Sequence, residues 1–202
     1  MSRHPGWPVR LEYGRVGLRP PRLRDASAWS TLRMANEAWL APWEPTSSQS
    51  WAARHSVASW TSTLSSLRRL GRAGALLPFM VTWDGELVGQ VTVSNIVRGA
   101  LRSGQVGYWV DRGHAGRGII TTAVALVTDH CFGPVGLHRV EIDIRPENGP
   151  SRRVVQKLGF REEGYLVRYL DIDGAWRDHL TYALTVEDAP GGLVRRLHEP
   201  LR

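Results

Sequence analysis

Cysteine, lysine and long apolar runs are the scarce features of this sequence of 202 residues. Its one cysteine, Cys131, can form no internal disulfide and no cysteine-based zinc site, which fits a reducing compartment such as the cytoplasm. No apolar run approaches the roughly 20 residues that span a bilayer, and residues 1–12 hold no apolar block typical of a secretory signal. The histidines show no metal-ligand spacing. We therefore expect neither a secreted disulfide-stabilised protein nor a membrane or metal protein.

The positive charge is carried almost entirely by arginine, because Lys157 is the only lysine. The formal net charge is +7, which favours anionic partners such as a phosphorylated cofactor, a nucleic acid or a ribonucleoprotein. The arginine preference of a GC-rich genome would give the same charge, and composition does not separate the two. A hydrophobic content of 42% over 202 residues fits one domain with a sizeable core.

A glycine-rich stretch at residues 113–122, Gly-His-Ala-Gly-Arg-Gly-Ile-Ile-Thr-Thr, is the most informative part of the chain. The apolar, aromatic and β-branched run at 105–110 predicts a strand before it. Apolar residues at helical spacing predict a helix over 121–132 after it. Such a loop presents backbone N–H groups and the partial positive charge of a helix N-terminus, which suits a phosphate or pyrophosphate. A bare strand-to-helix turn is the alternative, and this stretch alone leaves both open.

The remaining patterns predict an α+β domain, with a mixed, mostly antiparallel sheet and helices on both faces. Asp84-Gly85 and Asp173-Gly174 each separate two strand-like runs and are strong hairpin signals. Helices are predicted at residues 24–40, 48–70, 121–132 and 151–158, the last ended by Gly159. About seven strands are predicted, at residues 15–19, 76–83, 87–96, 105–110, 139–144, 160–170 and 175–185.

The second half of the chain resembles the GNAT acetyltransferases in an ordered set of short motifs. The set comprises Gly-Tyr-Trp-Val at 107–110, Gly-Arg-Gly at 116–118, the strand at 139–144, Asn-Gly-Pro-Ser at 148–151 and Lys-Leu-Gly-Phe at 157–160. Three further stretches, at 40–45, 94–99 and 172–179, resemble the RimJ group of the Rim-type ribosomal-protein acetyltransferases. The resemblance covers a domain at residues 13–187, and we expect a flexible arm at 1–12 and a flexible tail at 188–202.

This resemblance implies acetyl-CoA as co-substrate and an amine as the acceptor of the acetyl group. In the family, backbone amides of the glycine loop bind the pyrophosphate, and the splayed strand before the loop binds the pantetheine arm. Ala115 and Ile120 depart from the family's preferred residues, but main-chain donors serve with any side chain. The cofactor-binding residues that the resemblance implies are Trp109, Val110, Ala115, Gly116, Arg117, Gly118, Ile119, Ile120, Thr121, Asn148 and Ser151.

A thiolate leaving group benefits from a proton, and Ser151 is the residue predicted to supply it. Many GNAT enzymes use a tyrosine at the position of Val155, and valine cannot donate a proton. Some Rim-type enzymes assign this role to the serine that matches Ser151. The alternative role for Ser151 is the N-cap of the helix that it begins, and the two roles are compatible.

The general base is less well marked, because Leu170 stands where a relative of the Rim type has its glutamate. Glu141 and Glu44 are the predicted catalytic carboxylates, and Asp143 and His138 are further candidates. Alternation places Glu141 and Asp143 on one face of their strand. The alternative is that these carboxylates lie on a solvent-exposed strand face and are not catalytic, and this alternative is slightly favoured for Asp143. Glu44, in a Pro-Trp-Glu-Pro turn, is an acid that could also hold an N-terminal ammonium, or it is a plain surface residue.

The resemblance thus predicts acetyl transfer to the N-terminal α-amine of a ribosomal protein, by likeness one of the small subunit. Ribosome contact through the basic surface is a further expectation, for a monomer or homodimer without a membrane partner. One alternative is acetylation of a small amine such as a polyamine, an amino acid or an aminoglycoside. Another is a protein that binds RNA or the ribosome with weak or no catalysis, as the charge and the missing tyrosine and glutamate suggest.

Overall fold

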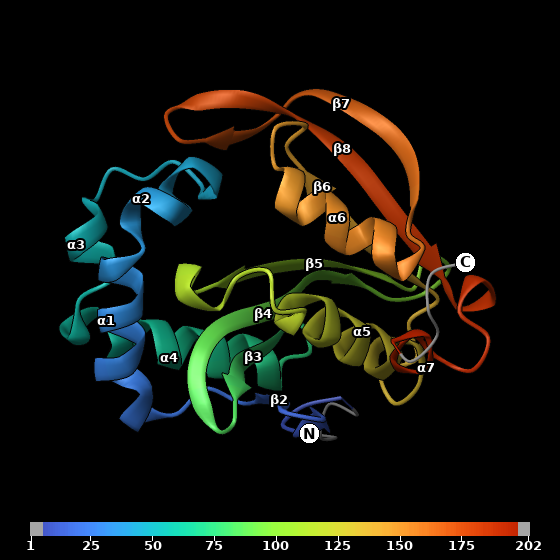
Figure 1. Cartoon of the computed structure of the whole chain (residues 1–202), viewed down its shortest axis with the longest axis horizontal. Coiled ribbons are helices and arrows are strands. Elements are labelled where there is room, and N and C mark those ends of the chain that lie inside the picture. Colours follow the sequence, from blue (N-terminus) through green and yellow to red (C-terminus); the bar gives the residue numbers. More distant parts are fainter. Residues whose placement is uncertain (1–5, 198–202) are drawn as a thin grey trace.

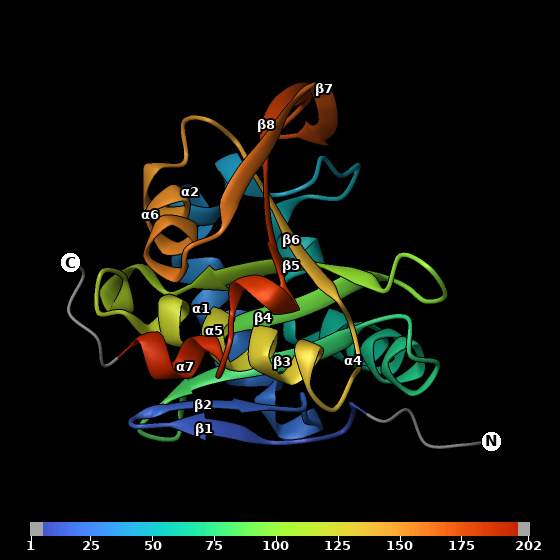
Figure 2. The ribbon, with the colours of Figure 1, turned by 90° about the vertical axis from the view of Figure 1, so that its right-hand side faces the viewer.

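The computed structural model describes residues 6–197, which contain one eight-stranded sheet. The order is β1-β2-β3-β4-β5-β6-β8-β7, and neighbours are antiparallel except for β5 and β6. Figure 2 shows the sheet from β1 and β2 at the bottom to the β7–β8 hairpin at the top. The predicted α+β class is confirmed, with one strand more than expected. The strands are β1 (Leu11–Tyr13), β2 (Val16–Arg19), β3 (Leu77–Trp83), β4 (Glu86–Val97), β5 (Ser103–Val110), β6 (Arg139–Ile144), β7 (Arg161–Ile172) and β8 (Ala175–Thr185).

The helices form two groups, and Figure 1 shows α1 to α4 together, apart from α5, α6 and α7. Helix α5 is the crossover that joins β5 to the parallel strand β6. Within the described part of the chain, no helix is long and apolar enough to cross a membrane. The helices are α1 (Ala26–Ala35), α2 (Glu37–Leu40), α3 (Trp51–Arg54), α4 (Val57–Arg72), α5 (Ile119–Phe132), α6 (Gly149–Leu158) and α7 (Leu193–Arg196).

Strand β3 is buried along almost its whole length because each face packs on an apolar core. Phe79 belongs to the larger core, which includes most of the buried face of α5. Met80, the next residue, belongs to a second core with Trp29, Trp60 and Leu64 of α1 and α4. Successive strand residues point to opposite faces, so the two helix groups cover opposite sides of the sheet.

Both hairpins predicted from Asp-Gly pairs are confirmed. Asp84 and Gly85 have φ angles of 51° and 86°, and Asp173 and Gly174 have φ angles of 49° and 75°. Two successive positive φ angles are what a tight two-residue hairpin turn requires, and its twist matches that of the flanking strands. These turns join β3 to β4 and β7 to β8.

The single helix predicted at 24–40 is wrong, because the helix breaks at Asn36 between α1 and α2. The Asn36 side chain donates to Asp111 Oδ1 at 2.7 Å and accepts from the Arg112 N–H at 2.8 Å. These partners belong to the loop after β5, far away in the sequence. A tertiary hydrogen bond therefore sets this break, and helical periodicity alone does not reveal it.

The single helix predicted at 48–70 is also divided, into α3 and α4. Ser56 lies between them and caps α4, since its Oγ accepts from the Ser59 N–H at 3.1 Å. Serine is a preferred N-cap because its oxygen satisfies an N–H that has no partner inside the helix. The prediction of one helix missed this break, because apolar residues recur at helical spacing on both sides of it.

The segment before β2 packs on the domain, unlike the flexible arm expected at 1–12. Trp7 is only 7% exposed, and its indole N–H donates to the Pro78 carbonyl at 3.2 Å. His130 Nε2 donates to the Gly6 carbonyl at 2.7 Å. Strand β1 then pairs with β2 and is the eighth strand. Residues 1–5 lie outside the described residues.

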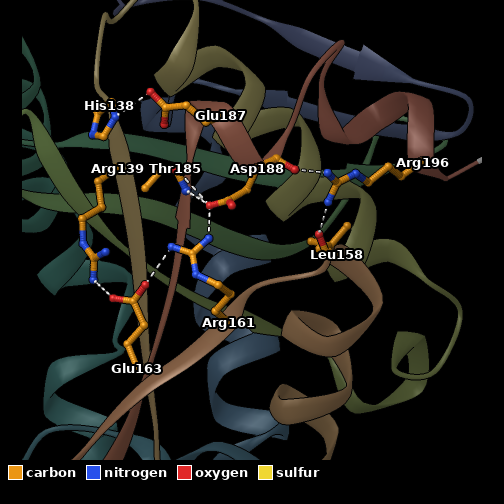
Figure 3. A network of polar contacts seen from close by, with 9 residues as sticks. All are labelled: His138, Arg139, Leu158, Arg161, Glu163, Thr185, Glu187, Asp188 and Arg196. Atoms are coloured by element: carbon orange, nitrogen blue, oxygen red, sulfur yellow. Dashed lines mark hydrogen bonds and ion pairs between the residues drawn. The ribbon is translucent and has the colours of Figure 1, made fainter.

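Most of the tail expected at 188–202 is tied to the domain as well. Asp129 on α5 accepts from the N–H groups of Leu193 at 2.6 Å and Val194 at 3.0 Å, which fixes the start of α7. Figure 3 shows Arg196 bonded to the Leu158 carbonyl and to the backbone of Asp188. Residues 198–202 lie outside the described residues.

Candidate active site

Strands β5 and β6 separate in the middle of the sheet and leave a wedge between them. Their parallel pairing covers three residue pairs, the last being Gln105 with Glu141. Beyond that pair, β5 stays paired with β4 as far as Val110, and β6 with β8 as far as Ile144. Among residues 6–197, the edge of β5 that faces β6 therefore has no strand partner beyond Gln105, so an extended ligand can pair with it.

The glycine loop follows β5 and leads into α5. Gly116 and Gly118 both have a φ of +77°, and nothing lies within 4 Å of a Cβ placed at either residue. Gly118 is the N-cap of α5, and the Thr122 N–H donates to its carbonyl at 3.0 Å as the first bond of the helix. The N–H groups before Thr122 in the first turn have no acceptor inside the helix. Open space in front of such groups is suited to an anion.

Asp111 holds the start of this loop. Its Oδ1 accepts from Asn36, and its Oδ2 lies 2.7 Å from His114 Nδ1. Burial opposes ionisation of Asp111, but the hydrogen bonds from His114 and Asn36 outweigh burial and lower its pKa. Next to it, the Trp39 indole donates to the Val110 carbonyl at 3.2 Å. The end of β5 and its loop are thus fastened to α1 and α2.

A cavity of about 250 Å³ opens in front of the loop, and we call it the loop-side cavity. Ten of the eleven predicted cofactor-binding residues line it, and only the exposed Arg117 does not. Arg153 and Lys157 of α6 add two cationic side chains to its wall. Backbone donors, a helix N-terminus and cations together fit the pyrophosphate of acetyl-CoA.

A second cavity, of about 480 Å³, is lined by residues of β5 and β6, and we call it the strand-side cavity. Asp143 and His179 line it, together with Gln90 and Thr92 of β4. Two ligands that occupied the two cavities would meet at the residues common to both. These residues, which we call the junction, are Trp43, Glu44, Tyr108, Trp109, Asn148 and Ser151.

Ser151 and Tyr108 are hydrogen-bonded at the junction, with 2.6 Å between their hydroxyl oxygens. Asn148 is the N-cap of α6, and its Oδ1 accepts from the Ser151 N–H at 3.1 Å. The alternative of Ser151 as the N-cap is therefore wrong, and its hydroxyl makes no capping bond. Burial raises the pKa of Tyr108 to about 12, against a smaller opposing effect of its bond to Ser151. The Tyr108 phenol is thus protonated at neutral pH.

Glu44 reaches the junction from the turn after α2 and is paired with a buried cation. Its Oε1 lies 2.7 Å from Nη2 of Arg33, a residue that is only 3% exposed. The Arg33 guanidinium also lies 4.7 Å from the ring centroid of Trp51 and 5.0 Å from that of Trp109. Cation–π contacts of this length are attractive. Arg33 therefore connects α1 to both Glu44 and the end of β5.

Asp143, and not Glu141, is the carboxylate that β6 contributes to the strand-side cavity. The two share one face of β6, as alternation predicts, but Glu141 pairs with β5 where the strands have not yet separated. Its Oε1 accepts from Arg139 Nε at 2.7 Å, and Glu141 lines neither cavity. Glu141 thus lies outside both cavities, and its role as a catalytic carboxylate stays a prediction that this position does not favour.

Asp143 is half-buried and accepts hydrogen bonds from Thr181 Oγ1 at 2.7 Å and Gln105 Nε2 at 3.1 Å. Burial raises the pKa of Asp143 above its ordinary value, and the bond from Thr181 opposes this only in part. A raised pKa makes its carboxylate a stronger base. The other candidate, His138, lines neither cavity. Its side chain contacts that of Glu187 (Figure 3), with 3.0 Å between Nε2 and Oε1.

Three residues of the site were not identified from the sequence. Arg33 lies four residues after Trp29, on the buried side of α1, and an arginine at such a position was the available signal. Trp43 lies in the 40–45 motif, yet nothing in that motif places it at a cavity. Tyr108 was expected to contribute backbone only. Among residues 6–197, no group of three or more His, Cys, Asp or Glu side chains could hold a metal ion.

Comparisons with known proteins show the family of this chain. The model of a family described as an acetyltransferase (GNAT) domain matches residues 15–161. The [ribosomal protein uS5]-alanine N-acetyltransferase of Escherichia coli (strain K12) is 32% identical over 91% of this chain and 94% of that protein. The probable N-acetyltransferase YjcK of Bacillus subtilis (strain 168) is 42% identical over 52% of this chain, and the match spans 58% of YjcK. The structure of Mycobacterium smegmatis RimJ in complex with CoA-disulfide is 52% identical, with a TM-score of 0.94, over 96% of this chain and 95% of that one.

Proposed function

This chain belongs to the GNAT acetyltransferases, and we propose that its acceptor is the N-terminal α-amine of a ribosomal protein. Enzymes of this family transfer an acetyl group from acetyl-CoA to an amine, and the chain is such an N-acetyltransferase. The observation that carries the proposal is the junction between the two cavities. The loop-side cavity suits the phosphates of acetyl-CoA. The strand-side cavity, which Asp143 lines, leads to the same junction.

The names of the relatives support a ribosomal acceptor. The Escherichia coli relative is named for the alanine of ribosomal protein uS5, and it matches almost the whole chain. The Mycobacterium smegmatis relative, RimJ, was solved with a CoA disulfide. By this likeness, the first acceptors to test are small-subunit ribosomal proteins whose chains begin with alanine or serine.

The loop-side cavity has the groups to hold acetyl-CoA, which supplies the acetyl group as a reactive thioester. The backbone N–H groups at residues 116–121, in the loop and the first turn of α5, would donate to its pyrophosphate. Arg153 and Lys157 would balance the negative charge. The free edge of β5 beyond Gln105 would pair with the amides of the pantetheine arm, which places the thioester end toward the junction.

The acceptor amine must lose a proton before it can attack, and Asp143 is our assignment for the group that takes it. The half-buried carboxylate lines the strand-side cavity, where an incoming amine would pass, and a water can relay the proton. Glu44 lines both cavities and forms an ion pair with Arg33. We assign it to attract the acceptor as an ammonium group. Ser151 would donate the hydrogen bond that stabilises the leaving thiolate.

The roof of the strand-side cavity supports a chain end as the acceptor. Pro45 forms a β-bridge with Ile172, and the Asp173 N–H donates to the Glu44 carbonyl at 3.2 Å. The turn after α2 and the tip of the β7–β8 hairpin therefore join over this side of the site, as the upper part of Figure 1 shows. A thin, extended N-terminus passes under such a roof more readily than a folded surface does.

The test is acetylation of peptides that copy the N-termini of small-subunit ribosomal proteins and begin with Ala or Ser. We expect CoA release and one added acetyl group on the α-amine, and none on the same peptides with a blocked N-terminus. Acetylation of polyamines but of no peptide would replace the proposal by small-amine transfer. Salt-dependent RNA binding without any CoA release would favour the RNA-binding alternative. Intact masses of ribosomal proteins from cells with and without this gene identify the acceptor.

A further inference from the structure

We propose that Tyr108 is a positioning residue for the acid step: its phenol orients the Ser151 hydroxyl toward the leaving sulfur and replaces the proton that Ser151 gives up. The proposal rests on acetyl transfer at the junction, and it does not depend on which amine is the acceptor. It also accounts for proton donation in a chain that has Val155 at the position of the family's tyrosine.

Tyr108 and Ser151 come from the two elements that border the wedge. Tyr108 belongs to β5, and Ser151 lies in the first turn of α6, directly after β6. Their hydroxyl oxygens are 2.6 Å apart, and both residues line both cavities. Asn148 caps α6 through the Ser151 N–H and so fixes the backbone that carries this hydroxyl. The pair is therefore held where the two ligands would meet.

Counting hydrogens gives the direction of the bond. Each hydroxyl has one hydrogen to donate and can also accept. Among residues 6–197, Ser151 is the partner that the structure gives the phenol oxygen of Tyr108, a half-buried residue. If the phenol donates to Ser151 Oγ, it is satisfied, and the Ser151 hydrogen is left to point into the junction. The reverse arrangement would leave the phenol hydrogen without an acceptor among these residues, which is unfavourable.

The chemistry favours a pair over a lone serine. A serine hydroxyl is a poor acid, because losing its proton would leave an alkoxide, whereas a phenol leaves a more stable phenolate. As the C–S bond breaks, its electron pair stays on sulfur, the Ser151 proton forms the new S–H bond, and the Tyr108 proton moves to Ser151 Oγ. Water then returns a proton to the phenolate, and the amine releases one to its base. Protons therefore balance over one turnover.

The first test measures the thiol pKa of enzyme-bound CoA from the ultraviolet absorbance of its thiolate, without any acceptor. Hydroxyl groups that donate to sulfur stabilise the thiolate, so we expect a higher thiol pKa, by about one, in both Tyr108→Phe and Ser151→Ala. The double variant should match Ser151→Ala, because Tyr108 acts through the serine. Tyr182→Phe is the matched control, since its hydroxyl bonds Glu162 and lines neither cavity.

The second test is turnover with any accepted amine. We expect Tyr108→Phe to lower kcat by about tenfold to 100-fold, with the Kd of CoA and the unfolding temperature nearly unchanged. A wild-type thiol pKa or kcat in Tyr108→Phe, or losses that multiply in the double variant, would overturn the proposal. Failure of every N-terminal peptide as acceptor would instead refute the proposed function and leave the thiol measurement to decide on Tyr108.

Discussion

Arg33 donates a hydrogen bond to Nε2 of His55 across 2.8 Å, and the His55 ring packs against Trp29 and Trp51. A guanidinium has no acceptor, so Nε2 of His55 must carry a lone pair. The other ring nitrogen, Nδ1, lies 3.0 Å from the Trp51 carbonyl, which can only accept, and so it carries the hydrogen. His55 is thus held neutral in one tautomer, next to the cation that pairs with Glu44.

Protonation of His55 should therefore weaken the fold at acid pH. Burial, and then the charges of Arg33 and Arg54, lower the pKa of His55 from 6.5 to about 4. The unfolded chain binds this proton near pH 6.5 and the folded chain only near pH 4, so stability falls as pH drops between these values. The expected loss is about 3 kcal/mol, with no further contribution below pH 4.

Thermal unfolding of His55→Gln from pH 4 to pH 7 measures this contribution. We expect the slope of Tm against pH to be shallower than in the wild type, whatever the absolute Tm. An unchanged slope in His55→Gln would show that this imidazole does not titrate between the two states.

Gly118→Glu should abolish acetyl-CoA binding. Its backbone is left-handed and open space lies in front of it, so the new carboxylate would enter the loop-side cavity at the expected pyrophosphate position. Gly136→Glu is the matched control, because Gly136 has a φ of +72°, equally open space and no place in either cavity. Both variants carry similar backbone strain, and calorimetry should show lost CoA affinity only in Gly118→Glu. Normal CoA affinity there would refute the placement of the cofactor.

The parts of the fold that were predicted correctly depend on local rules. The Asp-Gly hairpins need two positive φ angles, and the strand at 139–144 shows clean alternation, so a few adjacent residues suffice. The phosphate-binding character of the glycine loop was likewise predictable, because backbone N–H groups of one continuous segment would bind the phosphate. Six of the seven cofactor residues predicted within this loop accordingly line one cavity.

The parts that were missed depend on contacts between distant segments. Alternation put Glu141 and Asp143 on one face, but the pair at which β5 and β6 separate decides which of them faces a cavity. Asn36, where the helix breaks, is hydrogen-bonded to Asp111. Arg33 is part of the site because it pairs with Glu44 and lies over the ring of Trp109. Local sequence patterns do not predict such contacts between residues that are far apart in the chain.

Asp143→Asn tests the assignment of the base. A neutral amide cannot take the proton of the amine, so we expect kcat to fall by about 100-fold or more at neutral pH. In the wild type, kcat should fall as pH drops through the raised pKa of Asp143, and the variant should lack that limb. Glu141→Gln, on the same face but outside both cavities, should stay within about twofold of the wild type. A lowered kcat in Glu141→Gln together with a wild-type kcat in Asp143→Asn would instead support Glu141 as the catalytic carboxylate.

At neutral pH, Asp143→Asn should lower the activity but raise the stability of the fold. Because the folded-state pKa of Asp143 is raised, its favourable contribution is complete below the unfolded value of 3.8 and is lost as pH rises through the folded value. At neutral pH the buried charge costs stability, so Asp143→Asn should have a higher Tm than the wild type at pH 7. That difference should shrink toward pH 3.8, and a constant difference at all pH values would contradict the cause given for the shift.

Thr46 fastens the hairpin tip over the strand-side cavity, and removing its hydroxyl should loosen the acceptor site alone. Its Oγ1 donates to Asp171 Oδ1 at 2.6 Å and accepts from the Gly174 N–H at 2.8 Å. Thr46→Val keeps the shape but loses both bonds, worth about 1 kcal/mol each, so we expect the KM for a peptide acceptor to rise by about three- to tenfold. The KM for acetyl-CoA should stay unchanged, because neither Thr46 nor the hairpin tip lines the loop-side cavity.

Thr46→Ser retains the hydroxyl and should behave as the wild type. Faster hydrogen exchange of the Gly174 amide in Thr46→Val would report the loosened tip. Equal increases of both KM values would mean that the hairpin tip supports the whole site and not the acceptor side.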